Sequence, residues 1–264
     1  MGILDEIIAH KRSELAQRTR RPVAELEAEC RRLPPARDFA AALRRGGRGR
    51  VRLIAEVKRA SPSQGLLRAD LDPVAQARAY AGAGAAAISV LTDQKYFRGT
   101  LDDLVAVRAA VDVPVLRKEF IIEEHQLWES RLAGADAVLL IVAALELQAL
   151  RDLAQAAKGI GLETLVEVHT KDELERALEL GAPVVGVNNR DLQTLRTSLA
   201  PSIALLPLIP PGPVTVSESG MATAADVERV VAAGAHAILV GETLVRAADV
   251  RAKVKELLLA EREP

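Results

Sequence analysis

Short apolar segments alternate with longer amphipathic segments along most of the chain. Each apolar segment is rich in Val, Ile and Leu and is bounded by polar residues, Gly or Pro, a pattern typical of a buried β-strand. The strands predicted in this way cover 52–57, 86–91, 114–118, 137–142, 163–168, 184–188, 213–217 and 237–241. The segments between them have helical periodicity, for example 73–83, 101–110, 123–133, 146–158, 171–180 and 222–233.

A recurring Gly-Ala pair supports this alternation of helix and strand. The pair closes a predicted helix and opens an apolar segment at Gly84-Ala85, Gly134-Ala135, Gly181-Ala182 and Gly234-Ala235. Glycine directly after a helix is the usual left-handed cap. Eight strand–helix units predict an α/β fold, a (β/α)8 TIM barrel, for which about 250 residues is typical. An open doubly wound sheet is the alternative, but no Gly-x-Gly-x-x-Gly motif follows the first predicted strand.

About fifty residues precede the first predicted strand. They begin with an apolar helical stripe made by Ile3, Leu4, Ile7 and Ile8. Two further short helices are predicted, at 23–30 and 39–43. We therefore divide the chain into an N-terminal helical extension packed on the barrel, residues 1–50, and the barrel itself, residues 51–264. The extension could close the bottom of the barrel or cover its mouth, and spacing alone does not decide between these positions.

Several predicted strands end in polar side chains that a water-free core would not accept. Glu56 and Lys58 end the first strand, Lys118 the third, Glu167 the fifth and Asn188 the sixth. The carboxyl ends of the barrel strands meet at one face, where TIM-barrel active sites lie. We interpret the cluster as catalytic, because neighbouring lysines and glutamates separate one another's pKa values and supply both acid and base. The alternative is a structural ion-pair network across the barrel mouth.

The loops after the seventh and eighth strands predict a phosphate site. Ser219 and Gly220 follow the seventh strand, Gly241 and Glu242 follow the eighth, and each pair precedes a helix-forming stretch. Backbone N–H groups at a helix start bind phosphate, and glycine permits close approach. The same two loops form the usual phosphate site of TIM barrels. The alternative is that these glycines serve only tight turns.

Composition excludes several other classes of protein. The 264 residues carry a formal net charge of −1 and 49% of them are hydrophobic, so no charge excess points to a nucleic-acid partner or a membrane surface. The basic stretch 44–52 is interpreted as a solvated linker. A single cysteine, Cys30, excludes an internal disulfide and a cysteine-based metal site. The histidines have no metal-ligand spacing and are expected to pack or to lie at the surface: His10, His125, His169 and His236.

No segment is expected to enter or cross a membrane. The longest apolar run, 137–145, is far too short to span a bilayer. The N-terminus carries acidic residues early and lacks the long apolar region of a secretory signal. We therefore expect a cytoplasmic protein, either a monomer or a weak homodimer, and the sequence does not distinguish these two states.

The strand ends resemble those of indole-3-glycerol phosphate synthases. The matching segments follow the family's order and spacing and are highly specific as a set: 54–63, 116–120, 165–169, 186–192 and 217–220. The resemblance runs from the N-terminal helix to the final strand. One departure is Glu119, where the family usually has aspartate. We expect this departure to have little effect, because the neighbour of Lys118 should point away from the barrel axis.

The resemblance implies a phosphorylated small-molecule substrate, 1-(2-carboxyphenylamino)-1-deoxyribulose 5-phosphate. It implies ring closure with loss of carbon dioxide and water, giving indole-3-glycerol phosphate for tryptophan biosynthesis. It implies neither a cofactor nor a metal. Because the N-terminal segment carries the apolar stripe and the family has an extra helix there, we also expect this segment to cover the barrel mouth rather than the base.

Roles for individual residues follow from the same resemblance. Lys118 is the acid of ring closure, and strand alternation turns it, rather than Arg117, toward the axis. The acid and base of the dehydration remain open among Lys58, Glu56 and Glu167. Substrate contacts are implied for Asn188, Arg190, Ser61, Glu218, Phe97, Phe120, Leu139 and Leu192, and phosphate contacts for Ser219, Gly220, Gly241 and Glu242. The alternatives are an Arg190–Asp191 loop pair, an ordinary turn serine at Ser61 and simple core packing for the apolar residues.

Other functions are compatible with a phosphate-binding barrel. A lysine at a strand end can form a Schiff base, as in class I aldolases, and Lys118 or Lys58 could do so. Phosphoribosylanthranilate isomerase uses a cysteine and an aspartate, but Cys30 precedes the barrel. A non-catalytic barrel that only binds a ligand is hard to reconcile with the full set of polar strand ends.

Overall fold

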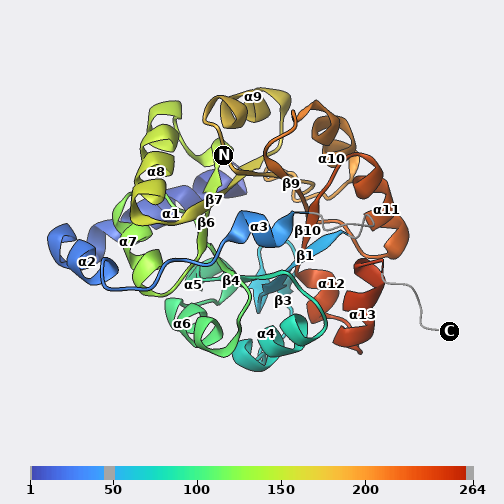
Figure 1. Ribbon diagram of the computed structural model, residues 1–264, viewed down its shortest axis with the longest axis horizontal. Coiled ribbons are helices and arrows are strands. Elements are labelled where there is room, and N and C mark those ends of the chain that lie inside the picture. Colours follow the sequence, from blue (N-terminus) through green and yellow to red (C-terminus); the bar gives the residue numbers. More distant parts are fainter. Residues whose placement is uncertain (1, 45–50, 260–264) are drawn as a thin grey trace.

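The computed structural model describes residues 2–44 and 51–259. Eight parallel strands close into a barrel in the order β1-β10-β9-β8-β7-β6-β5-β4, which confirms the predicted TIM barrel (Figure 1). The strands are β1 (Arg52–Val57), β4 (Ala87–Leu91), β5 (Val115–Lys118), β6 (Ala137–Ile141), β7 (Glu163–Val168), β8 (Val184–Asn188), β9 (Val214–Glu218) and β10 (Ala237–Val240). Each lies within one residue of its predicted range.

Helices surround the barrel, and their starts follow from local capping chemistry. Asp72 accepts hydrogen bonds from the first turn of α4, where Pro73 occupies the first helical position. Thr223 and Asp226 form a reciprocal capping box at the start of α11. The main helices on the outside are α4 (Pro73–Gly82), α6 (Leu101–Ala110), α7 (His125–Leu132), α8 (Leu147–Ile160), α9 (Lys171–Glu179), α10 (Ala200–Leu205), α11 (Ala224–Ala232) and α13 (Val250–Leu257). Of these, α10 and α13 lie outside the helical ranges predicted above.

Shorter elements complete the connections between strands and helices. They are β2 (Ala60–Ser61), β3 (Gly65–Leu66), α5 (Gln94–Phe97), α12 (Glu242–Val245) and the 3₁₀ turns η1 (Val142–Ala144) and η2 (Leu206–Leu208). The glycines of the recurring Gly-Ala pairs all have positive φ, from 68° at Gly181 to 113° at Gly234, as the left-handed cap requires. No helix in the described ranges is long and apolar enough to cross a membrane.

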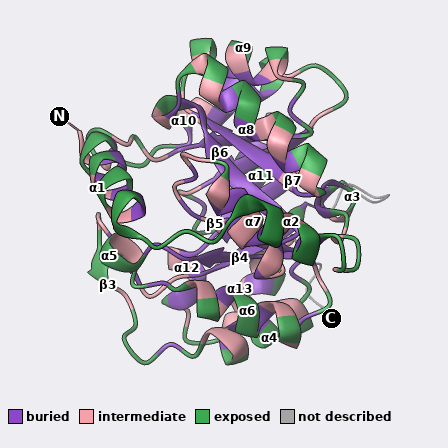
Figure 2. Ribbon diagram, turned by 90° about the vertical axis from the view of Figure 1, so that its left-hand side faces the viewer, coloured by how far each residue is buried: buried purple, intermediate pink, exposed green. Residues whose placement is uncertain are grey.

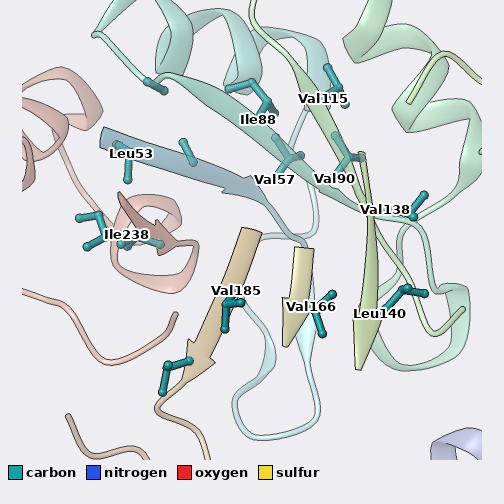
Figure 3. Packing of buried hydrophobic residues seen from close by; sticks show 14 of the residues in the cluster. Leu53, Val57, Ile88, Val90, Val115, Val138, Leu140, Val166, Val185 and Ile238 are labelled. Carbon is teal, nitrogen blue, oxygen red and sulfur yellow. The ribbon is translucent and has the colours of Figure 1, made fainter. Parts of the chain in front are cut away.

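Alternation along each strand produces two cores. Outward side chains such as Leu53, Val90 and Val166 pack beneath the helices (Figure 3). Inward side chains such as Ile54 and Leu165 fill the barrel itself. Because the side-chain period of a strand is two, the residues that continue the inward rows at the carboxyl ends must point into the barrel mouth. The packing of the cores therefore fixes the direction of every polar strand end.

The N-terminal segment reaches both ends of the barrel. Helix α3 (Phe39–Leu43) closes the bottom, where Phe39 and Leu43 are fully buried in the inner core and Glu163 Oε2 accepts a 2.8 Å hydrogen bond from the N–H of Ala40. Helix α1 (Ile3–Gln17) lies at the opposite end, and its residues Ile3, Leu4 and Ile7 line a pocket at the mouth. Figure 2 shows the two helices on opposite sides of the sheet. The expectation of a mouth cover holds for α1, whereas for α3 it is wrong.

Helix α2 (Val23–Cys30) connects these two helices along the side of the barrel, where it packs against α7. Its Cys30 is a free, buried thiol. Most of the basic stretch interpreted as a solvated linker falls on residues 45–50, which lie outside the described residues.

A buried ion cluster fastens α1 to the barrel. Lys11 is 2% exposed, and its Nζ lies 3.0 Å from Asp93 Oδ2 and 3.2 Å from Glu119 Oε1. Glu119 also accepts a 2.8 Å hydrogen bond from Thr92 Oγ1. Burial lowers the pKa of Lys11, but Glu119 and Asp93 outweigh it and raise that pKa above its usual value. Glu119 points away from the axis, as expected, and its carboxylate is a buried partner of α1. That the departure from aspartate has little effect stays a prediction.

We expect Lys11→Met to loosen α1. The substitution keeps the aliphatic stem but leaves two buried carboxylates without their cation, a change that typically destabilises by about 3–5 kcal/mol. Amide hydrogen exchange of the α1 backbone should therefore become much faster, and the urea midpoint should fall. Arg31→Ala is the control. The Arg31 side chain is 76% exposed where it pairs with Glu27, so its loss should change the free energy of unfolding by less than about 1 kcal/mol. Equal effects of the two substitutions would contradict the role of the cluster.

Candidate active site

A single pocket gathers the predicted site residues at the carboxyl ends of the strands. Its volume is about 500 Å³, which is within the usual range for small-molecule sites. The predicted residues in its wall are Glu56, Lys58, Ser61, Phe97, Lys118, Phe120, Leu139, Glu167, Asn188, Arg190, Leu192, Ser219, Gly220, Gly241 and Glu242. Glu218 is the exception. It is absent from the wall and 1% exposed, and its carboxylate forms an ion pair with Lys118, which does line the pocket.

Lys118 projects from the end of β5 between two carboxylates. Its Nζ lies 3.2 Å from Glu218 Oε2 and 3.4 Å from Glu167 Oε2. The preceding residue, Arg117, points the other way and donates 3.0 Å hydrogen bonds to Gln126 O and Ser130 Oγ of α7. Strand alternation therefore places Lys118 in the pocket and Arg117 between β5 and α7, as predicted.

Glu56 and Lys58 form a second lysine–carboxylate pair, on β1. Lys58 Nζ lies 2.8 Å from Glu56 Oε1. The space for this carboxylate comes from Gly241, since a Cβ at that position would lie 2.4 Å from Glu56 Oε1. The φ of Gly241 is −121°, so its backbone conformation alone does not demand glycine. A side chain at Gly241 would therefore displace Glu56 from its present position. Neither the phosphate prediction nor the turn alternative anticipated this contact.

Gly186 on β8 leaves space for the carboxylate of Glu218 in the same way. A Cβ at Gly186 would lie 2.1 Å from Glu218 Oε1 and 3.1 Å from Leu165 Cδ1. Glu218 Oε1 is buried and, within the described part of the chain, has no hydrogen-bond partner. Its other oxygen contacts Lys118, so the carboxylate is fixed on one side only.

The buried carboxylates respond differently to their surroundings. Burial raises the pKa of Glu56, but Lys58 and Lys118 outweigh it and hold that pKa below its usual value. For Glu167 the same balance, with Lys118 and His169 as the cations, also lowers the pKa. Burial and the nearby Glu167 raise the pKa of Glu218 to about 7, despite the opposing effect of Lys118. The cluster therefore combines two carboxylates with lowered pKa values and a third whose pKa is raised toward neutrality.

These carboxylates keep Lys118 charged. Burial lowers the pKa of Lys118, but Glu218, Glu167 and Glu56 outweigh it and raise that pKa well above its usual value. Lys118 is consequently an ammonium group throughout the physiological range. The site contains a permanent cation that faces the pocket with its proton in place.

A polar rim lies between β8 and the loops after β1 and β10. Arg190 donates to Ser63 Oγ, and its Nη2 lies 3.6 Å from Glu242 Oε2. The Arg190 N–H donates to Asn188 Oδ1 at 3.0 Å. The alternative pairing of Arg190 with Asp191 is wrong, because Asp191 Oδ1 instead accepts a 2.6 Å hydrogen bond from the N–H of Gln193.

The loop after β9 turns sharply beside this rim. Ser219 and Gly220 both have positive φ, 65° and 84°. Asn189 holds the turn, since its Nδ2 donates 3.0 Å hydrogen bonds to Ser219 O and to Ser217 Oγ. Opposite this turn, α12 begins at Glu242, and the first N–H groups of a helix have no partner within the helix. The start of α12, beside the β9 turn, thus brings backbone N–H groups that have no partner within the helix to one edge of the pocket.

Another part of the pocket wall is apolar. The rings of Phe97 and Phe120 lie 6.1 Å apart at an angle of 40°, a usual geometry for an aromatic pair. Leu139 and Leu192 line the same pocket. The α1 residues Ile3, Leu4 and Ile7 add a roof that the predicted site residues did not include, although their apolar stripe was visible in the sequence.

In residues 2–44 and 51–259, no group of three or more His, Cys, Asp and Glu side chains is arranged to hold a metal ion. The charged groups in the pocket wall include two lysines, their carboxylate partners and Arg190.

Comparison with known proteins matches this arrangement to one family. The family model described as Indole-3-glycerol phosphate synthase matches residues 4–257. A protein of that name from Roseiflexus sp. (strain RS-1) is 50% identical over 264 residues, covering 97% of each chain. The Chlorobium luteolum protein is 52% identical over 245 residues, covering 92% of this chain and 93% of its own. Indole-3-glycerol phosphate synthase 1 of Streptomyces coelicolor is 49% identical over 265 residues, covering 100% of this chain and 97% of its own.

Solved structures of more distant proteins share the barrel. The 3-hexulose-6-phosphate synthase of Salmonella typhimurium superposes with a TM-score of 0.63 at 15% identity, covering 79% of this chain and 97% of its own. Thiamine phosphate pyrophosphorylase of Pyrococcus furiosus gives a TM-score of 0.58 at 17% identity, covering 79% of this chain and 94% of its own. At this identity the likeness concerns the fold alone. The family model and the full-length relatives are more specific, and they show that the chain belongs to the indole-3-glycerol phosphate synthase family.

Proposed function

We propose that this protein closes the indole ring of indole-3-glycerol phosphate, using 1-(2-carboxyphenylamino)-1-deoxyribulose 5-phosphate as substrate. The observation that carries the proposal is the position of Lys118. Its ammonium faces the pocket between Glu167 and Glu218, with the backbone donors of the β9 and β10 loops at one edge of the pocket and apolar side chains on another. A substrate with a phosphate at one end and an aromatic ring at the other matches this distribution of chemistry.

The two ends of the substrate fix its orientation. We place the phosphate against the backbone of Gly220 and Gly241, where glycine and a helix start favour an anion. The aromatic ring then occupies the side lined by Phe97 and Phe120 under the α1 roof. Arg190, with Asn188 beside it, is suited to the ring carboxylate, because a guanidinium binds a carboxylate in a planar, bidentate fashion. The ketone is left near the lysines.

Ring closure needs a proton donor and a positive charge at the ketone oxygen. When the ring carbon attacks the ketone carbon, a carbon–carbon bond forms and the carbonyl electrons move onto oxygen. Lys118 stabilises this developing alkoxide and transfers its proton to it. An alkoxide is a much stronger base than an amine, so a lysine with a raised pKa still protonates it. Loss of carbon dioxide from the attacked ring carbon then restores the aromatic ring.

Dehydration requires a second acid and a base. The hydroxyl leaves with a proton, and a proton is lost from the neighbouring carbon as the double bond forms. We assign the acid to Lys58 and the base to Glu56, because the two side chains lie 2.8 Å apart on one strand and the pKa of Glu56 is lowered. Glu167 then serves as the carboxylate partner of Lys118 in ring closure. Each stage has its own lysine–carboxylate pair in this assignment.

The ionisation of Lys118 disfavours the Schiff-base alternative. Schiff-base formation needs a neutral amine as the nucleophile. The three carboxylates around Lys118 raise its pKa, so the neutral amine is scarce. Borohydride treatment with substrate present should therefore leave the protein without a covalent adduct at Lys118, as judged by mass spectrometry.

We expect purified protein to form the fluorescent indole product from this substrate, and Lys118→Met to abolish most of that turnover. Loss of a general acid typically lowers a rate by about 10²–10⁴-fold, and losing the charge adds to this effect. The Michaelis constant should change much less, because the phosphate and aromatic contacts lie elsewhere. Lys171→Met is the control, since the Lys171 side chain is 68% exposed on α9. A Lys118→Met protein with more than about a tenth of native turnover, above the range for acid loss, would refute the assignment.

Ser219→Ala should weaken phosphate binding. Ser219 lies in the left-handed turn at the phosphate edge, where its hydroxyl adds a donor to the backbone groups. One such hydrogen bond to a charged group contributes about 1.5–3 kcal/mol, so the Michaelis constant and the inhibition constant of inorganic phosphate should rise together, by about tenfold or more, with little change in turnover. Ser13→Ala on the exposed side of α1 serves as the control. A phosphate inhibition constant that stays at the native value would place the phosphate elsewhere.

Glu218 should titrate close to neutral pH. With its pKa near 7, its carboxyl should bind a proton between pH 8 and 6, as followed by carbon-13 NMR of labelled glutamate. Because the Lys118 cation lowers this pKa, Lys118→Met should move the titration to higher pH, and Glu218→Gln should remove it. If the Glu218 carboxyl signal of the native protein titrates only in the acid range, the raised pKa of Glu218 is wrong.

A further inference from the structure

His169 lies behind the pocket wall, beside Glu167. The two residues are two positions apart at the end of β7, so their side chains leave the strand on the same side. His169 Nε2 lies 3.5 Å from Glu167 Oε1, while the other oxygen of Glu167 lies 3.4 Å from Lys118 Nζ. His169 is absent from the pocket wall. The sequence indicated only a packing or surface role for this residue.

The first turn of α9 clamps the imidazole from the other side. Glu173 Oε2 accepts a 2.7 Å hydrogen bond from the backbone N–H of His169 and lies 3.3 Å from its Nδ1. Glu173 is itself held in place, because its N–H donates to the capping residue Thr170 at 3.2 Å. His169 Nε2 is buried and, within the described part of the chain, has no hydrogen-bond partner. The ring is therefore fixed at Nδ1 and directs Nε2 toward Glu167.

The acidic groups around His169 favour its charged form. Glu167, at 3.5 Å from Nε2, and Glu173, at 3.3 Å from Nδ1, lie on either side of the ring. Burial lowers the pKa of His169, but its hydrogen bond to Glu173 and the charges of Glu167, Glu173 and Glu218 outweigh burial and raise it. Asp191, in the loop after β8, is a further acidic neighbour. These acidic neighbours thus favour the charged form of the ring, against burial and the Lys118 cation on the other oxygen of Glu167.

We propose that His169 is a positioning residue, an imidazolium held between Glu173 and Glu167 that fixes the Glu167 carboxylate with its other oxygen on Lys118. The chain Glu173–His169–Glu167–Lys118 connects a helix start on the outside of the barrel to the pocket. His169 acts through Glu167 and does not touch the substrate. Its contribution to the reaction rests on the proposed function, whereas its pairing with Glu167 does not.

The kinetic test compares substitutions that keep or remove parts of the imidazole. His169→Phe keeps a ring but removes the charge, and we expect turnover to fall about tenfold, less than for loss of an acid itself, with the Michaelis constant within about twofold. Removing a cation raises the pKa of a nearby carboxylate, so the acid limb of the turnover–pH profile should move to higher pH. His169→Gln, which retains an N–H donor, should recover part of the turnover. His125→Phe is the control, because His125 has a similar exposure (14%) and also contacts a glutamate, at the start of α7 and outside the pocket wall.

An outcome in which His169→Phe loses turnover but keeps the native pH profile would overturn the proposal, because packing alone would explain it. Native turnover in His169→Phe would overturn it as well. Thermal melting identifies a variant that fails to fold, in which case His169→Gln decides by the same two criteria.

A titration separates this proposal from the proposed function. Proton NMR of the His169 ring should show its pKa falling in Glu167→Gln and again in Glu173→Gln, since each substitution removes a negative neighbour. An unchanged His169 titration in Glu167→Gln would overturn the pairing, whatever the substrate. Absence of turnover in the native protein would instead refute the proposed function, and the titration would still decide whether His169 and Glu167 are coupled.

Discussion

The structure of this site depends on the need to keep buried charges paired. Lys118 brings an ammonium into a pocket where an unpaired ion would be strongly destabilising. Glu167 and Glu218 compensate it at 3.4 and 3.2 Å. Their own burial is in turn tolerated because the cation is there, as the lowered pKa of Glu167 shows. No member of the cluster can be understood alone, since the ionisation of each depends on the others.

Glycine makes this density of charge possible. Carboxylates from β1 and β9 occupy space that side chains on β10 and β8 would otherwise fill, at Gly241 and Gly186. A closed barrel leaves little room at its axis, because inward side chains from all strands share it. Glu56 and Glu218 reach their lysine partners only because each is matched by a missing side chain on the adjacent strand. In these two cases the glycine is a packing requirement of the neighbouring acid.

Much of this arrangement was predictable from the sequence, because it depends on local rules. Strand positions follow from apolar segments, and strand period assigns Lys118 to the pocket and Arg117 to the seam with α7. The position of Glu218 outside the pocket wall was not predictable in this way. Its direction follows from strand period, but its depth depends on the space left by Gly186 on the adjacent strand β8. The predicted contact of Glu218 with substrate stays a prediction, and its contact with Lys118 is what the structure shows.

The N-terminal segment marks a different limit of sequence reasoning. The stripe of α1 and the apolar residues of α3 look alike in sequence, yet they cover opposite ends of the barrel, because which end a helix reaches depends on the path of the chain around the molecule. Lys11 distinguishes the two helices. Its buried cation requires acidic partners, and these are Asp93 and Glu119 at the mouth end of the barrel.

One of those partners, Glu119, directly follows Lys118, and the two side chains serve opposite purposes. Lys118 faces the pocket floor, whereas Glu119 binds the roof helix through Lys11 at 3.2 Å. The peptide between them is fixed in the barrel, because the carbonyl of Lys118 accepts a 3.2 Å hydrogen bond from the N–H of Thr92. The end of β5 therefore positions both the Lys118 ammonium in the pocket and, through Glu119, helix α1 over the pocket. A displacement of α1 strong enough to move Glu119 would act on the residue that carries the proposed chemistry.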